Sequence, residues 1–491
     1  MKRLALVALA AQAVFAADFV TGQAARAVIG QKYFTTQDNV SSDTVLGAVS
    51  GLAYANGSLF VVDSNRVSAS PMNHRVMIYR DIHSQVPSPT ADVTREGLKR
   101  CPLCGFKADV VLGQTTMTIP DTGAEPHLNQ SGFQEPTAVA TDGVHLVVAD
   151  TDNNRVMIWN RIPHTNYMPA DLVLGQSDFT SYTANSGSGD SRVPSAKSLR
   201  GPQGVWIQNG KLFVADTQNH RVLIWNSFPT ENFQPADMVL GQPSMTTATE
   251  TDLTKQESDP TPTSLLNPVS VTSDGVRLYV SDLGHNRVLV WKTIPTTNQA
   301  PADFALGQPD LNSGISNNSY KILSYDAATG VMKREKVLCD SNGTDTNGDL
   351  TFPAVCGSTM SFPRFALSDG ERLFIADGGN DRVLVYNTIP NESGAKADAV
   401  LGQITDSLVQ TSDSSGNPDA LRQSSADSMR TPCGLAWDGE NLYIGEPFSR
   451  RVLIYTAGAS TTLPKVRNAA SMEVYALGTF TLSGTIKEGD T

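Results

Sequence analysis

The sequence is poor in positive charge, in cysteine and in long hydrophobic runs. Its formal net charge of −12 at pH 7 repels nucleic-acid backbones and anionic membrane surfaces, which argues against both as partners. Beyond the N-terminal residues, no segment reaches the roughly 20 apolar residues of a membrane-spanning helix. The sequence also lacks Gly-x-Ser-x-Gly, His-Glu-x-x-His and phosphate-loop motifs, so no common hydrolase or nucleotide-binding signature is present.

Residues 1–17 have the composition of a cleaved secretory signal. Two positive residues precede an apolar run that is too short to span a bilayer, and the small residues Ala16 and Ala17 follow it. We therefore expect a secreted, periplasmic or cell-surface protein. In such a compartment, the five cysteines are expected to pair as disulfides, with one left over.

The cysteines fall into two spaced pairs and a single residue. Cys101 and Cys104 are two residues apart, and Cys339 and Cys356 bracket a polar stretch. We expect a disulfide within each pair. Zinc is the alternative for Cys101 and Cys104, but one such pair supplies only half of a tetrahedral ligand set. Cys433 is expected to be a buried free thiol.

A strand–turn–strand phrase recurs six times and is clearest at residues 202–225, PQGVWIQNGKLFVADTQNHRVLIW. Each copy contains Asn-Gly or Asp-Gly, which favours a tight hairpin turn. Each copy then reaches an arginine that opens a strand of alternating apolar residues. These arginines are Arg75, Arg155, Arg221, Arg287, Arg382 and Arg451. Such self-similarity indicates a repeat architecture.

A fourth strand containing Leu-Gly-Gln follows five of the six copies. Four antiparallel strands make one propeller blade, so we predict an all-β, six-bladed β-propeller over residues 18–456. A sixth strand of this kind lies upstream at residues 28–31 (VIGQ). We expect this N-terminal strand to complete the last blade, with residues 475–478 (YALG) as a rival for the same place. Residues 457–491 are expected to form a C-terminal extension that resembles the start of a further β-domain.

The phrase Pro-x-Gly-Val, Asn/Asp-Gly, Leu-Phe/Tyr-Val-Ala-Asp-Thr-x-Asn-x-Arg-Val resembles the NHL repeat of six-bladed β-propellers, here of a secreted bacterial type. The resemblance covers residues 51–455. The copies are longer than the roughly 40 to 50 residues that a propeller blade needs, so we expect the surplus in loops between blades. The resemblance implies binding and scaffolding modules, with a few lyases and calcium-dependent lactonases among related propellers. The fold alone does not choose among these functions.

An acidic residue ends the second strand of every copy, and an aromatic residue closes most of the third strands. The acidic residues are Asp63, Asp150, Asp216, Asp282, Asp377 and Glu446. A ring of carboxylates would suit metal or acid–base chemistry, but chemistry needs a residue once whereas blade geometry needs it in every blade. We therefore expect ion pairs and turn caps with the aromatic residues in the core, and we assign no catalytic residue.

Specific function is expected where the repeat is broken on one face of the propeller. The first copy has seven extra residues before its arginine, and the link after the fourth copy runs for 54 residues. The sixth copy replaces the usual turn with Glu-Pro-Phe-Ser-Arg-Arg. From these irregular segments we predict a binding face that includes Asn65, Arg66, His74, Glu446 and Arg450.

The long link contains a weak calcium pattern. Asp345, Asn347 and Asp349 place oxygen ligands at alternate positions. The glycine and the bidentate glutamate that a calcium loop needs are missing. We therefore expect a solvated loop clamped by the Cys339–Cys356 disulfide, with calcium as the alternative and no required cofactor.

Two functional hypotheses follow. The first is a secreted, monomeric, non-enzymatic propeller that binds a protein, peptide or glycan through its irregular loop face. The alternative is a metal-dependent lyase or lactonase-type hydrolase with a site at the propeller axis, where a cation would polarise a carbonyl oxygen. No histidine set in the sequence matches the metal ligands of the lyase-type relatives.

Overall fold

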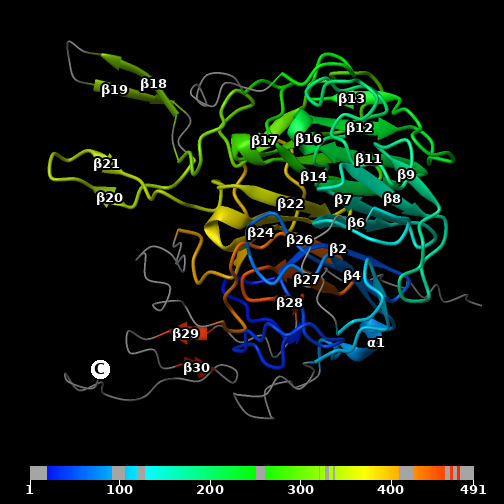
Figure 1. Ribbon diagram of the computed structural model, residues 1–491. Coiled ribbons are helices and arrows are strands. Elements are labelled where there is room, and N and C mark those ends of the chain that lie inside the picture. Colours follow the sequence, from blue (N-terminus) through cyan, green and yellow to red (C-terminus); the bar gives the residue numbers. More distant parts are fainter. Residues whose placement is uncertain are drawn as a thin grey trace, which may run out of the picture.

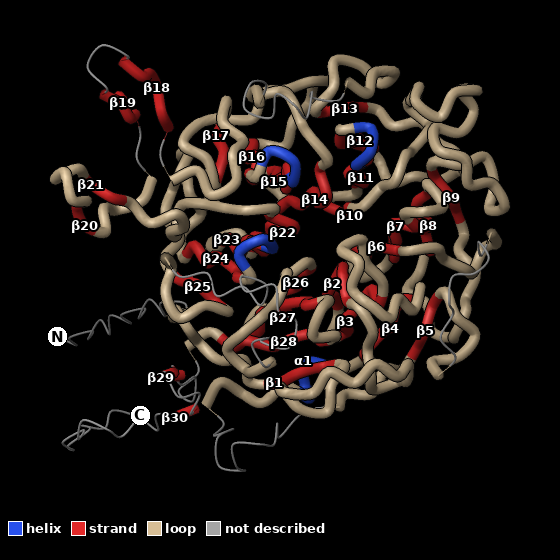
Figure 2. The backbone as a smooth tube through the Cα atoms, turned by 60° about the vertical axis from the view of Figure 1, so that its left-hand side comes forward, coloured by secondary structure: helices blue, strands red, loops and turns tan. Residues whose placement is uncertain are grey.

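The structure, a computed structural model of the 491-residue chain, describes residues 19–90, 105–118, 128–249, 260–319, 321–326, 331–335, 338–407, 424–458, 465–467 and 473–475. It is nearly all β (Figure 1). Six four-stranded antiparallel sheets form a ring, with their innermost strands around the centre (Figure 2). The predicted six-bladed β-propeller is confirmed. In the part of the chain that is described, no helix is long and apolar enough to cross a bilayer.

The first five blades each run outward from an innermost strand. Blade 1 is β2 (Val49–Ala55), β3 (Ser58–Asp63), β4 (Arg75–Tyr79) and β5 (Val110–Leu112), with the short helix α1 (Ile82–Gln85) after β4. Blade 2 is β6 (Pro136–Thr141), β7 (Leu146–Asp150), β8 (Arg155–Trp159) and β9 (Leu172–Leu174). Blade 3 is β10 (Gly204–Gln208), β11 (Lys211–Asp216), β12 (Arg221–Trp225) and β13 (Met238–Leu240). Blade 4 is β14 (Pro268–Ser273), β15 (Leu278–Asp282), β16 (Arg287–Trp291) and β17 (Phe304–Leu306). Blade 5 is β22 (Pro363–Ser368), β23 (Leu373–Asp377), β24 (Arg382–Tyr386) and β25 (Ala399–Leu401).

Blade 6 is built from both ends of the propeller sequence. Its inner strands are β26 (Gly434–Trp437), β27 (Asn441–Glu446) and β28 (Arg451–Thr456), and its outermost strand is β1 (Ala27–Ile29). β1 runs antiparallel to β28, with Val28 opposite Leu453. The N-terminal strand therefore closes the ring, as predicted, and pairing it with β28 removes an open sheet edge. Farther along, β29 (Lys465–Arg467) pairs with β30 (Glu473–Tyr475) and with no other strand of the described residues, and a further β-domain there stays a prediction.

Glycines are required where the chain turns between strands and links. In blade 3 the turn residues Asn209 and Gly210 have φ values of 51° and 71°, as a primed hairpin turn needs. In the Leu-Gly-Gln phrase of blade 2, Gly175 has a φ of 86°, and a Cβ there would lie 2.7 Å from the Leu199 side chain. Both the backbone conformation and the packing therefore select glycine at this position.

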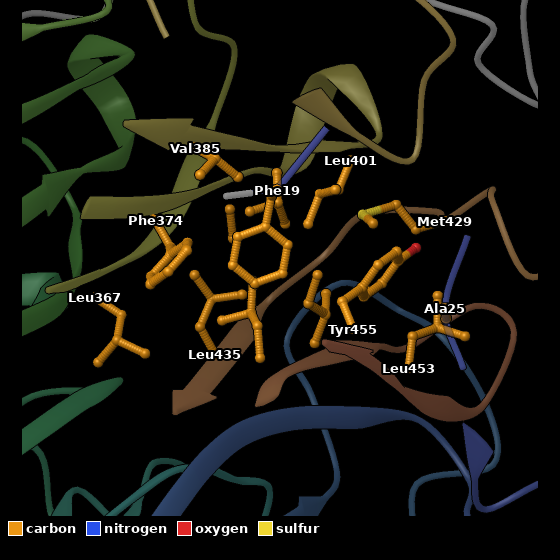
Figure 3. Close-up of a cluster of buried hydrophobic side chains, with 14 of the residues drawn as sticks. Phe19, Ala25, Leu367, Phe374, Val385, Leu401, Met429, Leu435, Leu453 and Tyr455 are labelled. Carbon is orange, nitrogen blue, oxygen red and sulfur yellow. The ribbon is translucent and has the colours of Figure 1, made fainter. Parts of the chain in front are cut away.

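The hydrophobic core lies mainly between neighbouring blades. Figure 3 shows one cluster, formed between blades 5 and 6, which contains Leu367, Phe374, Val385, Leu401, Met429, Leu435, Leu453 and Tyr455. Phe19 and Ala25 of the N-terminal segment complete this cluster. The aromatic residues that end the third strands, Trp159, Trp225, Trp291, Tyr386 and Tyr455, are all buried. Their predicted place in the core is confirmed.

The long link between blades 4 and 5 carries two hairpins. One is β18 (Lys321–Asp326) with β19 (Val331–Glu335), and the other is β20 (Gly343–Thr344) with β21 (Leu350–Thr351). Both hairpins project outward from the ring and lie away from blade 1 (Figures 1 and 2). The long link and the irregular segment of blade 1 are therefore separate features of the surface.

The closure can be tested through Val28, which is fully buried. We expect Val28→Ala to lower the free energy of unfolding by about 2 kcal/mol, because it removes two buried methyl groups and leaves a cavity. Val40→Ala is the control, since Val40 is 67% exposed. Thermal melts of both variants against the wild type provide the measurement, and equal melting temperatures would contradict closure by β1.

Candidate functional site

Each blade buries one ion pair where its second strand ends and its third begins. In blade 3, Arg221 Nε donates to Asp216 Oδ2 at 2.8 Å, and both side chains are fully buried. Equivalent Nε bonds of 2.7–2.8 Å occur in all six blades. The repeated carboxylates are thus held in ion pairs, as predicted, and are not open to solvent as ligands.

The other donors of each arginine bind the links on either side of the blade. Arg221 Nη1 donates to Met245 O at 2.6 Å in the following link. Its Nη2 donates to Ser195 O and Ser198 O, each at 3.0 Å, in the preceding link. These acceptors lie 24 residues after the arginine and 26 and 23 residues before it, and the same spacings recur in blades 2, 4 and 5. One buried cation therefore joins three segments of chain.

The residue before each arginine contacts the next blade. It has a left-handed backbone in every blade, with φ between 48° and 57°. In five blades its side chain accepts a hydrogen bond from a backbone N–H just ahead of the next innermost strand. The pairs are His74 with Glu135 N (2.9 Å), Asn154 with Gly201 N (2.8 Å), His220 with Asn267 N (3.1 Å), Asn286 with Phe362 N (3.0 Å) and Asp381 with Thr431 N (2.7 Å). We call this position the clasp.

The junction between blades 6 and 1, where the ring closes, uses a different contact. Arg450 occupies the clasp position and donates from Nε to Ser70 O at 2.7 Å and from Nη1 to Gln37 O at 3.0 Å. The N–H that a clasp would receive here belongs to Ala48, and it donates to Pro71 O at 2.9 Å. Ser70 and Pro71 belong to the irregular segment of blade 1, so this segment supports ring closure.

The five residues predicted for the binding face have unequal surroundings. His74 and Arg450 make the contacts between blades described above, and Glu446 is buried beside Arg451. Asn65 is 1% exposed, and its Nδ2 donates to Ala69 O at 2.9 Å. Asn65, His74, Glu446 and Arg450 therefore have structural roles.

Arg66 is the member of the set whose head group reaches the surface. It lies in the irregular segment of blade 1, and its Nη1 contacts Glu135 at 2.8 Å and also Asp152. Both carboxylates belong to the region of blade 2. A role in binding stays a prediction for the whole set, and Arg66 is the member best exposed to take part.

The long link is clamped at its base by a disulfide. Cys339 and Cys356 are joined, with Cα atoms 5.7 Å apart, as predicted. The proposed calcium ligands lie in the turn between β20 and β21, where Asp345 Oδ1 accepts hydrogen bonds from Asn347 N and Asp349 N at 2.8 and 2.9 Å. This is turn geometry that needs no ion, and calcium binding there stays a prediction. Cys101 and Cys104 lie outside the described residues.

A ring of six residues surrounds the propeller axis at the start of the innermost strands. In each blade, one residue at the start of the innermost strand lies opposite the buried acidic residue of the second strand, and the next residue along the chain belongs to the ring. The six members of the ring are Ser50, Thr137, Gln203, Val269, Arg364 and Cys433. Neighbours in this axial ring touch, since Ser50 Oγ donates to Thr137 O at 2.9 Å and Thr137 Oγ1 to Gln203 O at 3.2 Å. Arg364 is its one charged member. Arg364 does not belong to the repeat phrase, but a comparison of the residues that follow the strand-opening prolines would have found it.

The axial ring does not have the ligands of a metal site. Its members include no carboxylate and no imidazole. Throughout the described residues, no group of three or more His, Cys, Asp or Glu side chains is placed to hold a metal ion. Hard cations prefer oxygen ligands, above all carboxylates, so these residues do not fit the axial metal centre of the alternative hypothesis.

Cys433 is the free cysteine of the described part of the chain, as predicted. It is half-buried just ahead of β26, and its Sγ donates to Thr431 O at 3.2 Å. Burial raises the pKa of this thiol to about 11, although the nearby charge of Arg364 lowers it. The thiol is therefore protonated at neutral pH, which makes it a poor nucleophile.

Comparison with known proteins gives a local match. No family model matches the chain. Over 90 residues it is 34% identical to NHL repeat-containing protein 2 of Gallus gallus, a stretch that covers 18% of this chain and 11% of that protein. The chain thus spans about a tenth of the length of this curated relative.

Several solved structures share the general architecture at low similarity. A streptogramin B lyase is 8% identical with a TM-score of 0.36, covering 86% of this chain and 95% of its own. The hydrazine synthase of Kuenenia stuttgartiensis is 11% identical with a TM-score of 0.39, covering 86% and 98%. The designed Ika8 protein is 9% identical with a TM-score of 0.36, covering 86% and 100%. Likenesses this weak carry no argument about function.

The closed ring of six four-stranded blades defines the class of the protein as a six-bladed β-propeller. The six copies of its repeat phrase resemble the NHL repeat, and the local match to an NHL protein supports this resemblance.

The buried ion pairs can be tested in blade 3. We expect Asp216→Ala to destabilise the protein by about 3–5 kcal/mol, because Arg221 would remain buried without its carboxylate. Asp190→Ala removes the partner of the exposed Arg192 and should leave the melting temperature unchanged, since exposed pairs contribute little. Equal melting temperatures for the two variants would show that the Asp216 pair does not hold the blade.

A pH-dependent contact lies at the same junction of blades 6 and 1. His83 of α1 places Nδ1 3.0 Å from Asp438 Oδ2 in blade 6. This hydrogen bond raises the pKa of His83 above its ordinary value. The ion pair therefore stabilises the protein fully below about pH 6.5, and its contribution is lost as the pH rises through the raised pKa.

We expect His83→Gln to remove this pH dependence. Melting temperatures measured from pH 5 to 9 should show a smaller decline across neutral pH in the variant than in the wild type. His145→Gln is a control for a histidine paired with an aspartate within its own hairpin. Parallel curves for wild type and His83→Gln would rule out a contribution from this contact.

Proposed function

We propose that the chain is an exported, non-enzymatic propeller that binds a protein, peptide or glycan through its irregular loop face. One observation carries this proposal: the charged residues that recur in every blade are used inside the fold. The six carboxylates are paired with buried arginines, and five clasp residues bind the next blade. What differs between blades, and so can provide specificity, lies in the links and at the axis.

Export is supported by the signal pattern and by the disulfide. Residues 1–17 lie outside the described part of the chain, but their composition is that of a secretory signal. The Cys339–Cys356 disulfide suits an oxidising compartment such as the periplasm or the cell surface. A monomer is proposed because the outermost strand of each blade is three residues long, which leaves short edges for pairing with a second copy.

The alternative is a metal-dependent lyase or lactonase-type hydrolase. It would need a cation at the axis, but the carboxylates that suggested it are held by arginines, and the axial ring offers no carboxylate or imidazole. Elemental analysis of the purified protein tests this alternative directly. A stoichiometric metal, together with a melting temperature that rises on adding calcium or zinc, would favour it over the binding module.

Binding through the irregular face can be tested with Arg66. We expect the immobilised protein to bind a component of the envelope of its own organism, with protein and polysaccharide fractions assayed separately. Arg66→Ala should weaken this binding at least tenfold, because it removes the exposed head group of the irregular segment. Lys211→Ala is the control, since Lys211 lies at the hairpin turn on the opposite face.

Two results would contradict the proposal. One is equal binding by wild type and both variants in each fraction. The other is substrate turnover that disappears with a single substitution on the irregular face, because this would make the chain an enzyme.

A further inference from the structure

Arg364 in the axial ring is an arginine without a hydrogen-bonding partner. Among the described residues, no oxygen accepts a hydrogen bond from its guanidinium, and its Nε is buried. By contrast, Arg382 of the same blade donates to Asp377 and to three backbone carbonyls. A buried donor without an acceptor costs about 1–3 kcal/mol, so Arg364 is not explained by stability.

The neighbouring backbone is adapted to hold the Arg364 side chain. In blades 2 and 3, Thr151 and Thr217 follow the buried aspartate, and each Oγ1 donates to a proline carbonyl of the next blade at 2.7 Å. Blade 5 has Gly378 at this position. A Cβ on Gly378 would lie 2.9 Å from Arg364 Cδ and 3.0 Å from its Nε. Gly378 therefore lacks the contact with the next blade that the threonines make, and it leaves room for the Arg364 side chain.

An exposed aromatic residue lies two positions before Arg364. Phe362 is 47% exposed and has a left-handed backbone with a φ of 48°. The equivalent residues Glu135, Gly201, Asn267 and Thr431 have the same conformation, so the repeat imposes it, and blade 5 differs in placing an aromatic side chain there. Blade 5 thus has an exposed phenyl ring just ahead of β22 and, two residues later, an arginine without an acceptor among the described residues.

The adjacent part of blade 6 adds a second cation. The Arg430 guanidinium lies 4.3 Å above the Phe448 ring, and Arg430 is three residues before Cys433, the neighbour of Arg364 in the axial ring. The protein as a whole has a net charge of −12. A cationic and aromatic spot at the axis is therefore unlike the average surface of this chain, and it would attract an anion.

We propose that Arg364 binds a carboxylate of an acidic peptide at the propeller axis, with Phe362 in contact with an apolar side chain of the same peptide. This inference rests on the proposed binding function and names its ligand class. The planar guanidinium matches a carboxylate through two parallel hydrogen bonds. A peptide is favoured over an acidic glycan because the flanking side chains Phe362, Val269 and Cys433 offer few partners for sugar hydroxyls.

The test uses the full chain and a defined peptide. The probe is an end-blocked, fluorescein-labelled pentapeptide with two glutamates on each side of a phenylalanine, and its glutamine counterpart is the uncharged control. Fluorescence anisotropy should give a Kd for the acidic probe that rises at least tenfold in Arg364→Gln and less in Arg364→Lys. Gly378→Ala should also weaken binding, because its Cβ displaces the arginine. Arg192→Gln, at an arginine exposed on another link, should bind as the wild type does.

Stability separates a binding role from a structural one. Arg364→Gln should melt at or above the wild-type temperature, because it removes a partly buried cation that has no partner. Arg382→Gln, which removes a paired one, should melt lower. If Arg364→Gln lowers the melting temperature as Arg382→Gln does, Arg364 is structural and the inference is wrong.

The remaining outcomes also distinguish the inference from the proposed function. Equal affinity of the wild type and Arg364→Gln for the acidic peptide overturns the inference but leaves binding elsewhere on the irregular face intact. Binding of an oligogalacturonate that depends on Arg364, without binding of the peptide, overturns the peptide class. Absence of peptide binding by the wild type overturns the inference, while the Arg66 experiment decides the proposed function separately.

Discussion

The buried arginine of each blade is the interaction on which the rest of the structure depends. Burying a cation is unfavourable unless acceptors surround it, so the links must present carbonyls to that arginine, and in blades 2 to 5 they do so at fixed distances along the chain. This requirement explains how the long link is tolerated. Its hairpins lie ahead of Cys356, and Cys356 and Thr359 supply the carbonyls 26 and 23 residues before Arg382. The disulfide thus fixes the link at the point where the arginine needs it.

The junction of blades 6 and 1 has two arginine contacts in addition to the chain link that runs from β1 to β2 through residues 30–48. On one face Arg450 replaces the clasp and binds carbonyls of Ser70 and Gln37. On the other face Arg26 stands where the fourth strands of other blades have an aspartate, and its Nη2 donates to Ser88 O in blade 1 at 2.9 Å. Arg26 and Arg450 thus donate hydrogen bonds across this junction in addition to the chain connection.

The repeat predicted the blades, the closing strand, the ion pairs and the Cys339–Cys356 disulfide because each follows from spacing along the chain. It did not predict the roles of His74 and Arg450, since these depend on contacts between blades. The sequence also contains a finer signal. Asn73 and Asn219 each lie two residues before the arginine of their blade, and each donates a hydrogen bond to that blade's aspartate. The irregular segment therefore lies ahead of Asn73. Arg364 was missed because the axial ring is defined by the closed ring and by no repeated motif.

Three groups of arginines in this protein differ in their state of pairing. Those that open the third strands are buried and paired, those at the closing junction are bound to carbonyls, and Arg364 at the axis has no acceptor among the described residues. Its charge also bears on the metal-dependent alternative. A divalent cation about 6 Å from a guanidinium is repelled by about 5 kcal/mol at an effective dielectric constant of 20. An axial ring that holds Arg364 and no carboxylate therefore favours an anion over a metal ion, which supports the proposed binding module.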